Sequence, residues 1–202
     1  MLRLGLTGGI ASGKSAVAAM LREMGFAVLD ADSLAHRLIE PGQPTYNEVL
    51  QEFGPAVRAP DGRVDRGKLS AIVFADRSRL DRLNAIVHPR VAEVVFRQFE
   101  DWQRGGTRDA AFVEAALLIE SGIHKKLDGL VVAWCEPEQQ LQRLLARGLR
   151  EAEARCRIAA QLPVEEKLLL ATEKIDCSGS LEQTRRQVEA LAAKLRRGAV
   201  RG

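Results

Sequence analysis

A glycine-rich stretch near the amino terminus, GLTGGIASGKSAV at residues 5–17, constrains this chain more than any other feature. It follows the short apolar run Leu2–Thr7, which predicts a buried strand, and it leads into an amphipathic helical pattern from Lys14 to Met24. Gly25 predicts the end of that helix, and FAVLD predicts a second strand. The order strand, glycine loop, helix, strand predicts an α/β fold with a parallel sheet.

Within this stretch, GGIASGKS fits the pattern G-x-x-x-x-G-K-[ST], whose fixed positions here are Gly8, Gly13, Lys14 and Ser15. Glycines let backbone N–H groups turn toward phosphate oxygens, where a side chain would block the approach. The start of the helix adds its positive dipole end, Lys14 would neutralise the β- and γ-phosphates, and the Ser15 hydroxyl would bind Mg²⁺. A plain glycine turn with a chance lysine is the alternative. The predicted nucleotide-binding residues of this loop are Gly8, Gly9, Ile10, Ala11, Ser12, Gly13, Lys14, Ser15 and Ala16.

Composition limits the class of protein. The 202 residues suffice for one folded unit, and 46% hydrophobic with 28% charged residues is typical of a soluble globular chain. A net charge of +3 without a basic cluster does not indicate nucleic-acid binding, and no apolar run is long enough to cross a membrane. Three scattered cysteines, Cys135, Cys156 and Cys177, favour a reducing compartment. We therefore expect a cytoplasmic protein.

The rest of the chain alternates between helical and strand patterns. From about Pro41 to Gly105 it reads as mainly helical, and HPRVAEVVFRQFEDW predicts a helix that begins at its proline. DAAFVEAALLI, LDGLVVAW and EKIDC predict strands, and the stretches from Glu138 to about Arg150 and from Leu181 to Leu195 predict helices. The tail RRGAVRG predicts a disordered end.

Two aspartates follow the second predicted strand. Ligands of open parallel sheets lie beyond the carboxyl ends of the strands, and Asp30 and Asp32 would share one side there if the chain stayed extended. A carboxylate at this edge could orient an acceptor hydroxyl and accept its proton. The alternative is that Asp32 caps a helix that begins at Ser33. The residues alone do not decide between these interpretations.

An arginine-rich segment follows the fourth predicted strand. Arg143 and Arg147 share a helical face, and the polar stretch after them carries Arg150, Arg155 and Arg157. A mobile lid of this kind would cover the charge of a transferring phosphoryl group, whereas a solvated helix balanced by glutamates is the alternative. The chain lacks the N-K-x-D element of GTPases and the ABC-type signature, so its size favours a kinase of small molecules.

Several segments together resemble one family. GLTGGIASGKS, VLDAD, GRVDRGKLSAIVF, HPRV, ALLIESG and EPEQQLQRLLAR with RIAAQ resemble the dephospho-coenzyme A kinase family, from about residue 2 to about residue 190. The resemblance implies a P-loop NTPase fold, with a parallel sheet flanked by helices in an adenylate-kinase-like core. The chain would be one kinase unit over residues 1–202, with a discontinuous nucleotide-binding core, a helical acceptor-binding region at about 41–105 and a lid at about 143–165.

The resemblance also implies a reaction and its residues. The γ-phosphate of ATP would pass to the ribose 3′-hydroxyl of dephospho-CoA, the last step of CoA biosynthesis, with Mg²⁺. We expect no nucleic-acid or membrane partner, and the sequence leaves the oligomeric state open, with a monomer favoured. Asp32 would be the catalytic base and Lys14 the ligand of the γ-phosphate. The implied acceptor-binding residues are Asp32, Arg66, His88 and Arg90, and the further ATP-binding residues are Arg143, Arg157 and Cys177. A histidine at the start of a helix can also simply cap it.

The chain departs from the family pattern at a few positions. Ala11 stands where glycine is common, and a positive φ there would strain alanine by about 1 kcal/mol. Cys177 replaces a frequent asparagine, so a backbone contact to adenine is the one we expect to survive. The residues leave two other functions open. One is a kinase of a different acceptor, such as a nucleoside monophosphate, and the other is a non-catalytic nucleotide-sensing module, against which Lys14, Ser15 and Asp32 argue.

Overall fold

The computed structural model describes residues 1–106 and 109–198. The chain divides into two compact units. One comprises residues 1–30 and 98–202 and is termed the sheet unit below, and the other comprises residues 31–97 and is termed the helical unit.

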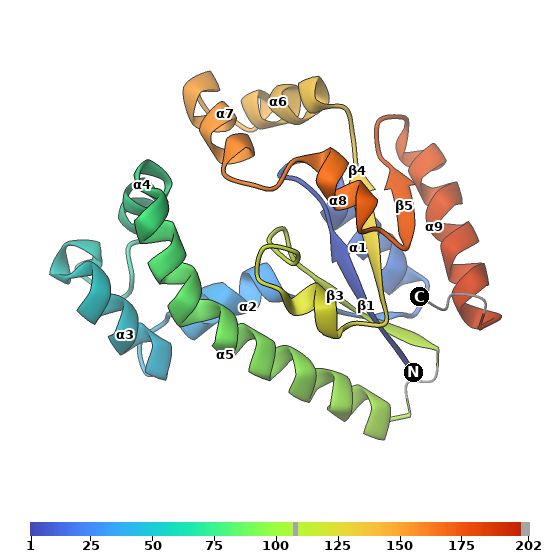
Figure 1. Ribbon diagram of the computed structural model, residues 1–202, viewed down its shortest axis with the longest axis horizontal. Helices are drawn as coiled ribbons and strands as arrows, with labels where there is room; N and C mark the ends of the chain where they lie inside the picture. The colour runs from blue at the N-terminus through green and yellow to red at the C-terminus, as the bar shows by residue number, and fades with distance from the viewer. Residues whose placement is uncertain (107–108, 199–202) are drawn as a thin grey trace. The chain divides into compact units, whose positions relative to one another are not determined.

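The sheet unit is built on parallel strands. Within the described residues, five strands pair in the order β2-β3-β1-β4-β5, and every pairing is parallel (Figure 1). They are β1 (Leu2–Thr7), β2 (Ala27–Asp30), β3 (Ala110–Glu114), β4 (Gly129–Trp134) and β5 (Glu173–Asp176). Each lies in a segment that the sequence predicts as a strand, and the predicted α/β fold with a parallel sheet is confirmed. The central strands β1, β3 and β4 read as apolar runs because they are covered on both faces, whereas the edge strand β5 has one buried residue, Ile175.

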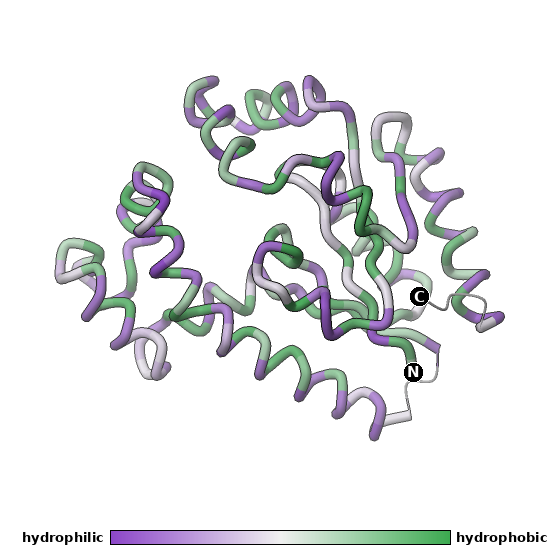
Figure 2. Tube along the Cα trace, in the orientation of Figure 1, coloured by the Kyte–Doolittle hydropathy of each residue, from purple (hydrophilic) through white to green (hydrophobic). Residues whose placement is uncertain are grey.

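Helices of the sheet unit follow the strands. They are α1 (Lys14–Glu23), η2 (Ile123–Lys126), α6 (Pro137–Ala146), α7 (Glu151–Ala159), α8 (Val164–Leu169) and α9 (Leu181–Arg196). Helices α1 and α9 pack together against the sheet, and Figure 2 shows how apolar and polar positions alternate along α9. The core there includes Leu4, Leu6, Val17, Leu21, Phe112, Val131, Val188 and Leu191. This packing holds β1 and α1, and with them the loop that joins them.

The helical unit contains α2 (Ala31–Leu38), α3 (Pro44–Phe53), η1 (Pro55–Val57), α4 (Arg66–Ala75) and the first part of α5 (Arg77–Arg104). Asp65 caps α4, because its side chain accepts a hydrogen bond from the Lys68 backbone N–H at 3.0 Å. The Tyr46 hydroxyl donates to the Gly62 carbonyl and ties α3 to the polar turn before α4. The helical character that the sequence predicts for this region is confirmed.

One helix start is wrong in the sequence prediction. The sequence predicts a helix beginning at Pro89, but Pro89 lies inside the continuous helix α5. Proline in a helix interior removes one backbone hydrogen bond, and the long run of helical sequence on both sides outweighs that cost. His88 therefore lies within a helix, and the alternative that it caps a helix start is wrong.

Two further sequence predictions concern the ends and the membrane. Helix α9 continues through Arg196, and residues 199–202 of the predicted disordered tail lie outside the described residues. Across residues 1–106 and 109–198, no helix has the length and apolar character that crossing a membrane requires.

Candidate functional site

The phosphate loop, a name used below for residues 8–15, comprises the turn between β1 and α1 and the first two residues of α1, and its backbone requires glycine at particular positions. Gly13 has φ 106°, which favours glycine, and a Cβ there would lie 2.7 Å from the Cβ of Cys177. A Cβ at Gly8 would lie 2.2 Å from the carbonyl oxygen of Ala133. The two glycines that fix the sequence pattern are thus required by the geometry of the loop and by its contacts with the ends of β4 and β5.

Ala11 has the positive φ under which the sequence analysis expects strain for alanine. Its φ is 59°, and it is the one residue other than glycine with a positive φ in the described part of the chain. This conformation costs alanine about 1 kcal/mol. The Ala11 carbonyl accepts a hydrogen bond from Arg143 Nη1 at 3.1 Å, which stabilises the strained peptide.

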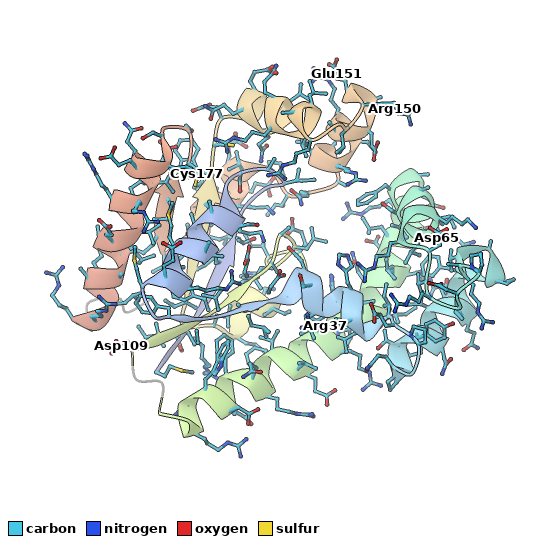
Figure 3. The ribbon with its side chains drawn as sticks, turned by 180° about the vertical axis from the view of Figure 1, so that it is seen from behind. Arg37, Asp65, Asp109, Arg150, Glu151 and Cys177 are labelled. Atoms are coloured by element: carbon cyan, nitrogen blue, oxygen red, sulfur yellow. The ribbon has the colours of Figure 1, made fainter. Side chains whose placement is uncertain are left out.

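Arg143 lies on α6 and braces the loop. Its Nη2 donates to the Cys177 carbonyl at 2.7 Å, while Nη1 holds Ala11, so one guanidinium joins the phosphate loop to the turn after β5. Cys177 directly follows β5, and its position is labelled in Figure 3. The sequence predicts a nucleotide contact for both residues. That nucleotide contact stays a prediction. Sequence reasoning missed the hydrogen bonds by which Arg143 joins the phosphate loop to the turn after β5.

Burial makes the two thiols near the loop poor nucleophiles. Burial raises the pKa of the Cys177 thiol to about 11, and burial also raises the pKa of Cys135. Both groups are therefore protonated at neutral pH, because each pKa lies above the ordinary thiol value. Cys177 serves as a small apolar contact for Gly13 and as a backbone carbonyl for Arg143.

A buried carboxylate holds the lysine of the phosphate loop. Glu114 is the last residue of β3, and its Oε1 lies 3.0 Å from Lys14 Nζ while its Oε2 lies 3.3 Å from Arg22 Nη2. The side chain of Glu114 is 5% exposed, so this charge needs its partners. Sequence reasoning missed Glu114. The available signal was a carboxylate at the end of an apolar strand, where the edge of a parallel sheet meets its ligand.

The residues at this edge fit Mg²⁺ when a nucleotide is bound. Ser15 is exposed in the first turn of α1, beside the positive end of the helix. Hydroxyl and carboxylate oxygens are ligands that Mg²⁺ accepts, and the ion usually completes its shell with water and substrate phosphates. The described residues hold no cluster of three His, Cys, Asp or Glu side chains. The Ser15 hydroxyl, together with nucleotide phosphates and water, is a donor set that Mg²⁺ accepts.

The arginine-rich segment forms α6, α7 and the turn between them. Arg157 Nη2 pairs with Glu153 at 2.8 Å and Arg155 with Glu151 at 2.7 Å, both along α7. Arg147 and Arg150 form no ion pair within the part of the chain that the structure describes. Figure 3 places Arg150 beside Glu151 at the start of α7. The alternative interpretation, a helix whose arginines pair with its own glutamates, therefore holds for Arg155 and Arg157. A contact between Arg157 and phosphate stays a prediction.

The predicted acceptor residues all lie in the helical unit. Asp32 is half-buried in the first turn of α2, which begins at Ala31, so it does not cap a helix starting at Ser33, and the chain does not stay extended beyond Asp30. Arg66 Nη2 lies 3.3 Å from Glu40 Oε1, and Arg90 Nη1 lies 3.5 Å from Glu93 Oε2. His88 precedes Pro89 inside α5. These ion pairs are exposed, so solvent screens them and a ligand can replace them at low cost.

Comparisons with known proteins agree on one family. The model of the family described as dephospho-CoA kinase matches residues 2–183. A dephospho-CoA kinase of Symbiobacterium thermophilum is 50% identical over 188 residues, which is 93% of this chain and 78% of the relative. The relative of that name from Geobacillus kaustophilus is 44% identical over 191 residues, 94% of each chain.

Solved structures support the same fold. A crystal structure of TT1252 from Thermus thermophilus has a TM-score of 0.80 at 37% identity, covering 96% of this chain and 97% of the other. A dephospho-CoA kinase from Campylobacter jejuni has a TM-score of 0.72 at 25% identity, covering 98% of both chains. A shikimate kinase from Acinetobacter baumannii shares the fold, with a TM-score of 0.52 at 13% identity over 100% of this chain and 96% of that one. With the phosphate loop and its buried lysine partner in place, this chain belongs to the dephospho-CoA kinase family.

Proposed function

We propose that this kinase transfers the γ-phosphate of ATP to the ribose 3′-hydroxyl of dephospho-CoA, which yields CoA and ADP. The observation that carries the proposal is the complete phosphate loop, with Lys14 paired to the buried Glu114, in a chain that belongs to this family. A buried ion pair at the carboxyl edge of the sheet keeps Lys14 ordered before the nucleotide arrives. Preorganised charge of this kind stabilises a transition state without reorganisation during the reaction.

ATP binds the phosphate loop in this proposal. The backbone N–H groups at the start of α1 and the positive end of its dipole bind the phosphates, and Lys14 exchanges part of its contact with Glu114 for phosphate oxygens. Ser15 would hold Mg²⁺, which supplies positive charge that neutralises the β- and γ-phosphates. The backbone of Cys177 contacts the adenine.

The acceptor binds the helical unit. Arg66, His88 and Arg90 bind the phosphate-bearing acceptor, after Arg66 and Arg90 leave their exposed glutamate partners. Asp32 orients the 3′-hydroxyl and takes its proton as the oxygen attacks the γ-phosphorus in line with the leaving ADP oxygen. The lid, residues 143–165, excludes water that would otherwise hydrolyse ATP, and its arginines cover the equatorial phosphoryl oxygens.

The test measures ADP release from the purified protein with ATP and Mg²⁺. Dephospho-CoA, AMP and no acceptor are compared, and the variant Asp32→Asn is set beside the control Asp61→Asn, an exposed aspartate of the same unit. We expect turnover with dephospho-CoA, formation of CoA, and a loss of roughly 10²–10⁴-fold in kcat for Asp32→Asn alone.

Each other outcome contradicts a stated part of the proposal. Faster turnover with AMP would identify a nucleoside monophosphate kinase. Tight ATP binding without turnover on any acceptor would identify a nucleotide-sensing module. An Asp32→Asn variant as active as Asp61→Asn would show that another group takes the proton.

A further inference from the structure

The link between α7 and α8, residues 160–163, holds the phosphate loop through a side chain. Gln161 Oε1 accepts a hydrogen bond from the Ile10 backbone N–H at 2.7 Å. Ile10 directly precedes the strained Ala11, so this bond fixes the Gly9–Ile10 peptide, one peptide before the positive-φ residue. Gln161 lies within the proposed lid, but the proposed mechanism gives its side chain no role of its own, and its separation of 151 residues from Ile10 hides the contact in the sequence.

The next residue of the link is attached to a buried ion pair. The Leu162 backbone N–H donates to Glu120 Oε1 at 2.9 Å, and the same oxygen lies 3.0 Å from Lys167 Nζ. Lys167 is fully buried and Glu120 is 19% exposed. Separating such a pair leaves a charge in a poorly solvated place, so the pair fixes the backbone of the link firmly.

The ion pair is in turn attached to the strand that leads into the phosphate loop. Lys167 Nζ donates to the Ala116 carbonyl at 2.9 Å, and the Thr7 hydroxyl at the end of β1 donates to the same carbonyl at 3.3 Å. Thr7 directly precedes Gly8. The link between α7 and α8 is thus connected to the residue before the phosphate loop, Thr7, through Lys167 and the Ala116 carbonyl, and to Ile10 within the loop through Gln161.

Apolar side chains of α6 and α7 also pack against residues 10 and 11 of the phosphate loop. Ile10 and Ala11 pack against a small cluster that includes Leu144 of α6 and Ala154 of α7. Next to Ile10, a Cβ at Gly9 would lie 2.2 Å from Gln140 Nε2, so a second glutamine restricts this part of the loop from α6. The cluster leaves Ile10 and Ala11 partly buried, and the loss of a partner for a partly buried N–H costs more than the loss of one at an exposed position.

We propose that Gln161 is a positioning residue for ATP, which holds residues 9–11 of the phosphate loop in their phosphate-binding conformation from a link fixed by the Glu120–Lys167 pair. It acts through Ile10 and touches no substrate. Because Gln161 lies two residues beyond the end of α7, the same side chain joins the lid to the loop. The inference rests on the proposed function only in taking ATP as the nucleotide.

The test compares Gln161→Met with Gln161→Glu. Methionine keeps the length of the side chain and removes the acceptor oxygen, whereas glutamate keeps an acceptor oxygen and adds a charge. The control is Gln142→Met, at an exposed glutamine of α6 that bonds to Glu138 on the helix surface. Three quantities are measured without any acceptor: hydrogen exchange of the Ile10 amide in the free protein by NMR, the Kd of a non-hydrolysable ATP analogue by calorimetry, and Tm.

We expect Gln161→Met to lose protection of the Ile10 amide and to bind the analogue about tenfold more weakly, with Tm close to that of Gln142→Met. Gln161→Glu should restore protection of the amide, although its charge also weakens binding of the phosphates. The proposal is overturned if Gln161→Met binds the analogue as the control does. It is also overturned if Ile10 stays protected, or if Tm falls while the Kd is unchanged, since Gln161 would then be structural alone. These readouts hold even if the acceptor is not dephospho-CoA.

Discussion

The phosphate loop and helix α7 lie in the same unit, and their charged side chains are held in opposite ways. Lys14 and Glu114 pair at 3.0 Å with side chains 12% and 5% exposed. Arg155 and Glu151 of α7 pair at 2.7 Å with side chains 63% and 59% exposed. Solvent screens the Arg155–Glu151 pair and scarcely reaches the Lys14–Glu114 pair. Only the buried pair therefore strongly restricts the positions of its two side chains.

The origin of the partners differs as well. The phosphate loop is held by groups from distant elements: Arg143 of α6, Gln161 of the link and Glu114 of β3. The ion pairs of α7 join residues four apart on the same helix. The loop is therefore organised before a ligand binds, whereas the arginines of α7 can exchange glutamate for phosphate oxygens at little cost. This difference suits the proposed order, in which the loop binds ATP and the lid closes afterwards.

The largest effect should come from the buried lysine. Replacing Lys14 by methionine removes the charge that meets the phosphates and leaves Glu114 with Arg22 alone. We expect kcat/KM for ATP to fall by about 10²–10³-fold in a steady-state assay of CoA formation. Lys125→Met, at an exposed lysine of η2, is the control and should stay near the wild type. If the Lys14 variant kept more than about a tenth of the activity, the buried pair would not mark the phosphate-binding lysine.

A smaller effect, on the free energy of unfolding, is expected when variants of Arg143 and Arg155 are compared. Arg143→Met removes hydrogen bonds to the carbonyls of Ala11 and Cys177, and we expect the free energy of unfolding to fall by about 1–3 kcal/mol. Arg155→Met removes an exposed pair within α7 and should cost less than about 0.5 kcal/mol. Urea denaturation of both variants measures the difference. Equal losses would show that the loop is braced no more firmly than the helix surface.

The smallest effect concerns the strained residue of the loop. Ala11→Gly relieves about 1 kcal/mol of strain but adds a similar entropy to the unfolded chain, so stability should change by less than about 0.5 kcal/mol. Ala19→Gly, at an exposed position inside α1, gains no such relief and should cost about 1 kcal/mol. Thermal and urea unfolding compare the two. A loss at Ala11 as large as that at Ala19 would mean that the strain is already relieved in the native loop.

Particular residues show which parts of the fold and of the candidate site could be predicted from the sequence. The strand before Gly8 and the helix from Lys14 were both predicted, because each depends on glycine placement and apolar spacing within a few residues. The positive φ of Ala11 was raised only as a condition, from the glycine that is common at that position in the family. Pro89 misled the prediction, since a proline typical of a first helical turn lies inside α5. Asp32 was placed near the end of β2 correctly, but whether α2 began before or after it depended on packing that the local sequence does not encode.

By itself, the sequence determined that a phosphate loop joins a buried strand to a helix, because backbone conformation there follows from which positions lack a side chain. Only the tertiary structure decided what holds that loop. Glu114 lies 100 residues from Lys14, Arg143 lies 132 residues from Ala11, and Gln161 lies 151 residues from Ile10. Pairs so far apart are brought together by the order of strands in the sheet and by burial, and no local pattern of residues carries that information.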